Sequence, residues 1–243
     1  MSSETTSGPA PYNPYQPPSA DVELGDGFEP SSFEGPYQPW RTIWLQPRKT
    51  IRQIVERDPT HAVLLLASLS GIVQALDNAT ERGLGDQVSL INVVLISCLA
   101  GPLGGILGVW IGAALLAWTG RWLRGVGSMR NLRAALAWGT LPAAVGALPL
   151  WLLAMAVLGE ELFTTATPRL DASPGLAVFL LGFAAVAVVL AVWAVVLTLN
   201  TVAEVQHYRS AWRALLNFLL VITVVLLPIL LLVMLLGVLV SMA

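Results

Sequence analysis

The uncharged stretch QVSLINVVLISCLAGPLGGILGVWIGAALLAWTG, residues Gln87–Gly120, decides the fold class of this chain. It runs for 34 residues, and a membrane helix needs about 20 apolar residues to cross a hydrocarbon core of roughly 30 Å. The stretch is therefore too long for one upright helix and too short for two full spans with a turn. Gly101-Pro102 lies near its middle, and proline disrupts the hydrogen bonds of a helix. We expect one tilted or kinked span. A re-entrant pair of half-helices broken there is the alternative.

Four further uncharged stretches show the same character. They are Pro59–Leu76 (18 residues), Ala134–Gly159 (26), Ala172–Ala203 (32) and Ala214–Ala243 (30). The chain of 243 residues is 56% hydrophobic and 12% charged, against roughly 25% charged in a typical soluble domain. Its mean hydropathy is +0.71. The composition argues against a soluble enzyme and predicts an all-α, polytopic membrane helix bundle of about five transmembrane helices over residues 59–243.

The connecting segments predict the orientation of these spans, because Lys and Arg collect on the cytoplasmic side of a membrane protein. Eleven basic residues fall on one side: Arg41, Arg48, Lys49, Arg52, Arg57, Arg121, Arg124, Arg130, Arg133, Arg209 and Arg213. Only Arg82 and Arg169 fall on the other side. We expect a multi-pass protein of the cell membrane with a cytoplasmic N-terminus and an external C-terminus.

Residues 1–40 form a tail of a different kind. They hold eight of the sixteen prolines, six acidic residues and no Lys or Arg, so we expect a disordered cytoplasmic segment and no signal peptide. The string Pro-Tyr-Gln-Pro occurs at Pro14–Pro17 and again at Pro36–Pro39. Such strings favour polyproline II, which partner domains recognise. The tail is read either as a plain soluble leader or as a docking site for a cytoplasmic partner.

Residues 41–58 predict a short amphipathic helix lying in the membrane interface. Ile51, Ile54 and Val55 recur at helical spacing, and the rest of the surface carries a basic collar. The collar consists of Arg48, Lys49, Arg52 and Arg57. It is read as an ordinary positive-inside flank, with recognition of anionic lipid as the alternative.

Small residues and prolines mark the interior of the spans. The stretch 87–120 contains a predicted helix-packing seam made of Gly101, Gly104, Gly105, Gly108 and Gly112. Glycine lets two backbones approach closely, so the seam predicts packing within the chain or, as the sharper alternative, a homo-oligomer interface. Helix kinks are predicted at Pro102, Pro142, Pro149 and Pro228.

The uncharged stretches contain no acidic or basic side chain, which disfavours proton-coupled transport. A neutral polar cavity remains an alternative, with Asn92, Ser97, Thr140 and Asn200 as candidate lining residues. Catalysis has no support, because Cys98 is the single cysteine and the two histidines, His61 and His207, lie far apart. We predict no catalytic, metal or cofactor site, and a net charge of −2 predicts no nucleic-acid partner.

Three blocks of sequence together resemble the Yip1 family of integral membrane proteins. They are Trp44–Ile51 leading to Asp58-Pro59, then Gly125–Ser128 with Trp138–Pro142, and finally Ala203–Gln206 with Trp212–Ala214. The resemblance covers about residue 40 to the C-terminus and implies five spans with the N-terminus inside. Eukaryotic members carry an Asp-Leu-Tyr-Gly-Pro motif near the first span, which this chain lacks. The resemblance therefore implies a bacterial branch and does not carry over the association with Rab-type GTPases.

The leading functional hypothesis is a non-enzymatic membrane protein that organises the membrane or its partner proteins. The alternative is a transporter, channel or lipid-translocating protein that uses a neutral polar cavity between kinked helices.

Overall fold

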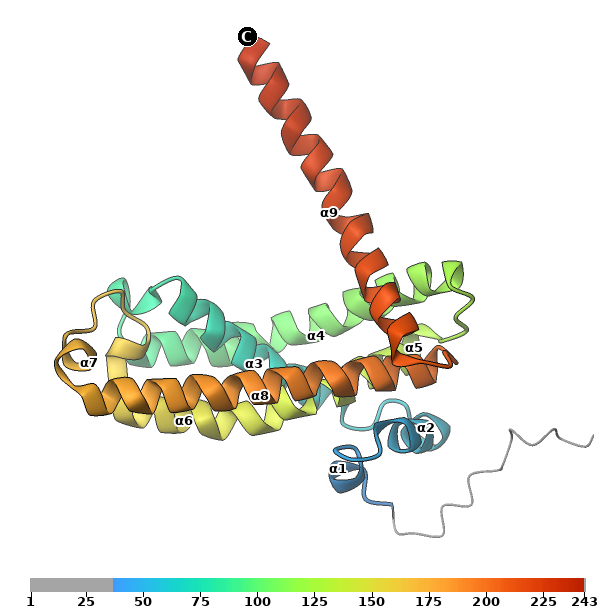
Figure 1. The fold of residues 1–243 in the computed structure, drawn as a ribbon, viewed down its shortest axis with the longest axis horizontal. Coiled ribbons are helices and arrows are strands. Elements are labelled where there is room, and N and C mark those ends of the chain that lie inside the picture. The colour runs from blue at the N-terminus through green and yellow to red at the C-terminus, as the bar shows by residue number, and fades with distance from the viewer. Residues whose placement is uncertain (1–36, 243) are drawn as a thin grey trace, which may run out of the picture. The chain divides into compact units, whose positions relative to one another are not determined.

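The computed structural model describes the backbone of residues 37–242 and the side chains of residues 37–237, and every regular element in this part is helical (Figure 1). The elements are α1 (Pro39–Thr42), α2 (Pro47–Arg57), α3 (Val63–Glu81), the 3₁₀ turn η1 (Leu84–Asp86), α4 (Leu90–Trp122), α5 (Met129–Gly139), the π-helical segment η2 (Pro142–Gly146), α6 (Ala147–Leu158), the 3₁₀ turn η3 (Gly159–Leu162), α7 (Pro168–Ala172), α8 (Pro174–Val205) and α9 (Ala211–Met242). The all-α prediction is confirmed for these residues. Most of the predicted tail, residues 1–36, lies outside the described part.

Within the described residues, five helical segments are long and apolar enough to cross a membrane, as the uncharged stretches predicted. They are Val63–Glu81, Leu90–Trp122, Met129–Leu162, Pro174–Val205 and Ala211–Gly237. The protein is therefore a multi-pass membrane protein.

The long stretch 87–120 forms one continuous helix. α4 passes through Pro102 without ending, which excludes the re-entrant pair in this structure. A helix of 33 residues is about 50 Å long at 1.5 Å per residue, more than the roughly 30 Å of the hydrocarbon core. α4 must therefore tilt or extend beyond the membrane.

The first span begins and ends later than the charge pattern indicated, at Val63–Glu81 instead of residues 59–76. α3 continues past Leu76 to Glu81, so it includes Asp77. The Asp77 side chain is half-buried and borders a cavity of about 290 Å³ between α3, α6 and α8. The prediction that the span ends before this carboxylate was wrong, because a charge near a helix end can be accommodated by packing without ending the helix.

Proline shapes the third span. Pro142 begins the π-helical segment η2, which separates α5 from α6. A proline lacks the N–H that would continue the α-helical ladder, which accounts for a break at this position. Pro149 lies inside α6 and Pro228 inside α9, and the kinks predicted there stay predictions.

α3 and α4 pack backbone against backbone (Figure 1). A Cβ atom added to Gly71 would lie 2.8 Å from the Cα atom of Gly105 and nearer still to the carbonyl oxygen of Gly101. Real carbon contacts begin near 3.5 Å, so glycine is required on both helices here. Two glycines of the predicted seam, Gly101 and Gly105, therefore pack within the chain.

Candidate functional site

A groove of about 590 Å³ lies between α3, α4, α5 and the first turns of α9. Its floor is formed by exposed glycines of α4, Gly104 and Gly108, and a Cβ atom added to either would have no atom within 4 Å. Gly112 continues the floor and approaches the Leu136 side chain. The seam predicted from spacing thus divides into a packed pair and an open row. We call the open region the glycine groove.

One half of the glycine groove is polar. Ser70, Gln74 and Asn78 recur every four residues on α3, so they share one helix face. Thr140, the residue that follows α5, lies opposite. The hydroxyl oxygens of Ser70 and Thr140 are 3.0 Å apart, and Thr140 also donates to the carbonyl oxygen of Ala137 at 3.1 Å. Ser70 is therefore the donor between the two hydroxyls.

The other half of the glycine groove is apolar. It is lined by Leu116 of α4 and by Phe218 and Val221 of α9. The polar stripe on α3 runs from Ser70 to Asn78, which are eight residues apart, or about 12 Å along the helix, less than half of the hydrocarbon core. Among the described residues, the polar lining of the groove is therefore shorter than the thickness of a membrane.

The four polar residues predicted to line a cavity do not meet. Thr140 lies in the glycine groove, whereas Asn92 is exposed near the start of α4 and Ser97 is buried elsewhere on that helix. Asn200 lies near the end of α8, in contact with α2. Sequence reasoning did not select Ser70, Gln74 and Asn78 as lining residues, although their four-residue spacing was a usable signal.

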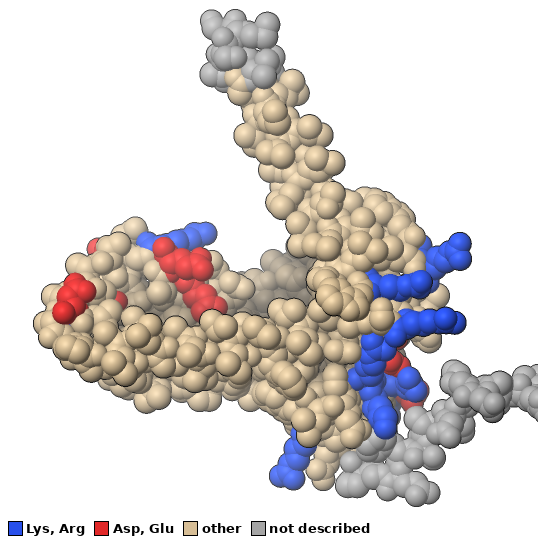
Figure 2. Space-filling model, in the orientation of Figure 1, with Lys and Arg blue, Asp and Glu red and all other residues tan. Residues whose placement is uncertain are grey.

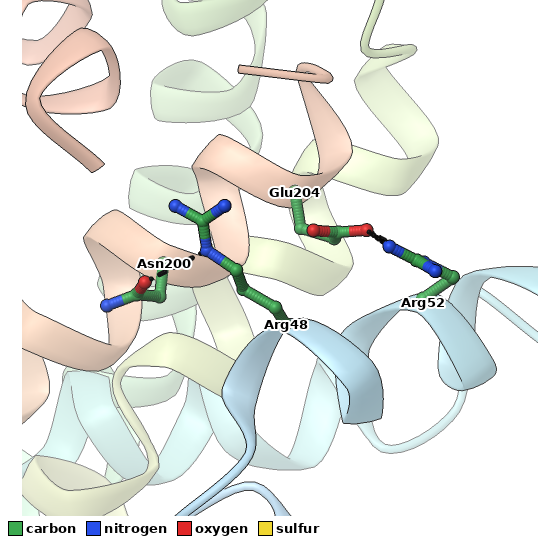
Figure 3. A network of polar contacts seen from close by, with 4 residues as sticks. All are labelled: Arg48, Arg52, Asn200 and Glu204. Carbon is green, nitrogen blue, oxygen red and sulfur yellow. Dashed lines mark hydrogen bonds and ion pairs between the residues drawn. The ribbon is translucent and has the colours of Figure 1, made fainter. Parts of the chain in front are cut away.

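The amphipathic helix α2 packs on protein. Its apolar residues Ile51 and Ile54 are fully buried, and α2 contacts α5 and α8. Figure 3 shows two polar links from α2 to α8: Arg48 Nε donates to Asn200 Oδ1 at 3.1 Å, and Arg52 binds Glu204 with its nearest atoms 2.5 Å apart. Arg48 and Arg52 of the basic collar therefore hold α2 on the bundle.

A buried polar network joins the loop after α4 to α8 and α9. The Gln206 amide donates to the carbonyl oxygen of Leu116 at 3.0 Å, and its oxygen accepts from the Gly127 N–H at 3.0 Å. Asn217 of α9 donates to the same Leu116 oxygen at 3.2 Å and accepts from Thr119 Oγ1 at 2.5 Å. The side chains of Gln206 and Asn217 are at most 1% exposed, so these hydrogen bonds replace the hydrogen bonds to water that burial removes.

Charge is segregated along the molecule. Figure 2 shows acidic side chains gathered at the end where α7 lies and most basic side chains at the opposite end, around α2 and α5. We call the latter the basic end. Two carboxylates at the acidic end have structural partners: Glu161 accepts from the N–H groups of Arg169 and Leu170, and Asp86 accepts from the N–H of Thr165.

The described residues contain no group of three or more His, Cys, Asp or Glu side chains placed to hold a metal ion. Cys98 is exposed on α4. His61 lies in the turn before α3, and His207 lies in the turn after α8.

Comparison with known proteins identifies the family. A family model, the Yip1 domain, matches residues 41–240. The chain belongs to the Yip1 domain family. No curated protein and no solved structure matches it.

The three blocks that resemble Yip1 proteins meet at the basic end of this Yip1 domain. Arg48 of the first block contacts Asn200, just before the third block, while Gly127 of the second block contacts Gln206 of the third. Trp138 of the second block donates to the carbonyl oxygen of His61, which follows the first block, at 3.1 Å. Segments far apart in sequence therefore form one structural unit.

Proposed function

We propose that this Yip1-domain protein is a non-enzymatic organiser of the membrane that acts by lateral association of helices. The observation that carries the proposal is the open row of Gly104 and Gly108 on the floor of the glycine groove, where added Cβ atoms would have no neighbour within 4 Å. Membrane helices associate through such surfaces, because small residues let backbones approach and gain van der Waals contact.

The occupant of the glycine groove is α4 of a second copy of the chain. Two copies related by a two-fold axis present the same surface to each other, and a row of glycines spaced by four is complementary to itself. Large apolar side chains flank the row: Leu107 is 60% exposed and Ile111 is 58% exposed. They would pack around the glycine contact of the partner helix.

The proposed orientation places the basic end and the N-terminus in the cytoplasm. It rests on the distribution of basic residues and on the charge segregation in Figure 2. The tail with its two Pro-Tyr-Gln-Pro strings then faces the cytoplasm, where it is available to a partner protein. Since the chain lacks the Asp-Leu-Tyr-Gly-Pro motif, we place it in a bacterial branch of the family.

Cysteine cross-linking in liposomes tests the association. On a Cys98→Ser background, Ile111→Cys lies beside the glycine row, while Leu99→Cys is 73% exposed on the other side of α4 and serves as the matched control. We expect oxidation to link Ile111→Cys chains into dimers and to leave Leu99→Cys chains monomeric. Adding Gly104→Leu and Gly108→Leu should abolish the link. Equal cross-linking at both positions would contradict the proposal.

Lipid translocation is the second candidate, and the polar stripe Ser70, Gln74 and Asn78 favours it. A groove that is open to lipid and polar along one wall could guide a headgroup part of the way across the bilayer. Because the lining is polar over less than half of the thickness, we expect no translocation of fluorescent phospholipid in proteoliposomes. Translocation that falls in a Gln74→Leu, Asn78→Leu variant would replace the organiser proposal with this one.

A further inference from the structure

A separate cavity lies at the basic end, between the start of α2 and the last turns of α8. Its volume is about 600 Å³, within the range of roughly 300–1,000 Å³ typical of small-molecule sites. We call it the α2–α8 cavity. Arg48 and Lys49 line it from α2, and Trp193, Val196 and Asn200 line it from α8.

Arg48 is held so that its terminal nitrogens remain available. Asn200 donates its amide to the carbonyl oxygen of Val196 at 2.8 Å, which turns its own oxygen toward Arg48 Nε. Figure 3 shows the two terminal nitrogens of Arg48 turned away from Asn200, and within residues 37–237 they have no hydrogen-bond partner. A guanidinium with two free amino groups matches the oxygens of a phosphate.

The charge of the α2–α8 cavity is uncompensated by its lining. Among the residues that the structure describes, no carboxylate lines it and Lys49 forms no ion pair. Arg52, one turn further along α2, differs because Glu204 neutralises it. The cavity therefore presents two positive groups to a ligand.

The opposite wall is suited to hydrocarbon. Trp193 and Val196 are each 39% exposed on α8, and Leu197 is buried behind them. Tryptophan is enriched at the level of lipid headgroups, where one edge of the ring is wet and the rest is apolar. A ligand that fills this cavity should combine an anionic group with an acyl chain.

We propose that the α2–α8 cavity binds an anionic glycerophospholipid, with its phosphate on Arg48 and Lys49 and one acyl chain along Trp193 and Val196. The site faces the cytoplasmic leaflet, and this placement rests on the orientation given under the proposed function. Basic pockets between membrane helices on that side are suited to anionic headgroups. The proposal differs from a general basic flank because it assigns the lipid to two named cations and an apolar wall.

Native mass spectrometry of the full chain in detergent tests the site. The protein is incubated with phosphatidylglycerol and phosphatidylcholine in equal amounts. Arg48→Gln, Lys49→Gln is compared with Arg121→Gln, Arg130→Gln, which removes two exposed charges from the same proposed membrane side. We expect wild-type protein to prefer phosphatidylglycerol and the first variant to lose about tenfold or more of that preference, since each basic group contributes roughly a factor of five. The control should stay within about twofold.

A second measurement needs no variant. Phosphatidylglycerol should raise the melting temperature of the wild-type protein more than phosphatidylcholine does, whereas glycerol phosphate, which has no acyl chain, should leave it unchanged. The proposal would be overturned if wild-type protein bound the two lipids equally, or if both variants lost the same amount of the preference for phosphatidylglycerol. It would also be overturned if glycerol phosphate, without an acyl chain, raised the melting temperature. Neither readout depends on dimerisation or lipid translocation, so this result is separable from the proposed function.

Discussion

From the contact between α3 and α4 we predict how the substitution Gly71→Ala changes the free energy of unfolding. The added Cβ atom would lie 2.8 Å from the Cα atom of Gly105 and nearer still to the carbonyl oxygen of Gly101. Carbon atoms normally approach to about 3.5–4.0 Å, so the two helices would have to separate by at least about 1 Å. Overpacking of this kind typically costs about 1–3 kcal/mol. Because any Gly→Ala change inside a helix also gains helix propensity, we expect Gly71→Ala to have a free energy of unfolding lower by about that amount than Gly104→Ala, in which this gain is the same.

Gly104→Ala is the matched control, because it adds the same methyl group to a helix where no atom lies within 4 Å. Alanine is a better helix former than glycine by up to about 1 kcal/mol, so this variant should be neutral or slightly more stable.

The assay is unfolding by SDS in dodecylmaltoside micelles, followed by circular dichroism at a dilution where light scattering shows monomers. If Gly104→Ala destabilises the protein as much as Gly71→Ala does, the backbone contact between α3 and α4 is refuted.

Three further predictions concern the basic end. Gln206→Leu leaves the buried Leu116 oxygen with one hydrogen-bond donor fewer and the Gly127 N–H without its acceptor. The free energy of unfolding, measured by a thermal melt in detergent, should therefore fall by about 2–4 kcal/mol. A double-mutant cycle of Arg52→Gln and Glu204→Gln should give a coupling energy of about 0.5–1 kcal/mol that falls with added salt, because Arg52 is half-exposed; a coupling indistinguishable from zero at low salt would contradict the ion pair. Burial raises the pKa of Tyr208, although Arg213 opposes the effect, so the folded protein should lose stability as the pH rises above about 10, and Tyr208→Phe should flatten that part of the pH profile of the melting temperature.

Sequence reasoning was least reliable for properties that depend on which neighbours a side chain contacts. Charges were read as the ends of spans, and this failed at Asp77, which α3 includes because its half-buried side chain packs beside α6 and α8. The search for a cavity selected Asn92, Ser97, Thr140 and Asn200 by polarity, and only Thr140 lies in the glycine groove. Polarity records the cost of leaving a side chain in lipid, but it does not record the direction in which that side chain points.

The glycines of α4 show the same division. Their spacing predicted a packing seam, whereas the choice between Gly101 with Gly105 and Gly104 with Gly108 depended on where α3 lies. Residues in a helix are rotated by about 100° from one to the next, so glycines four apart share a face whereas the adjacent Gly104 and Gly105 point in different directions. The first pair packs on Gly71, and the second is left open.

The sequence by itself determined whether each segment lies in water or in lipid. The fold class, the five spans and the expected orientation follow from this. These properties follow from the transfer of individual side chains between water and lipid, and they add along the chain without knowledge of neighbours. Only the tertiary structure decided that α4 is continuous, that Arg48 meets Asn200 across 152 positions, and which glycines remain open. These features depend on how helices pack against one another, and packing is a property of pairs of surfaces.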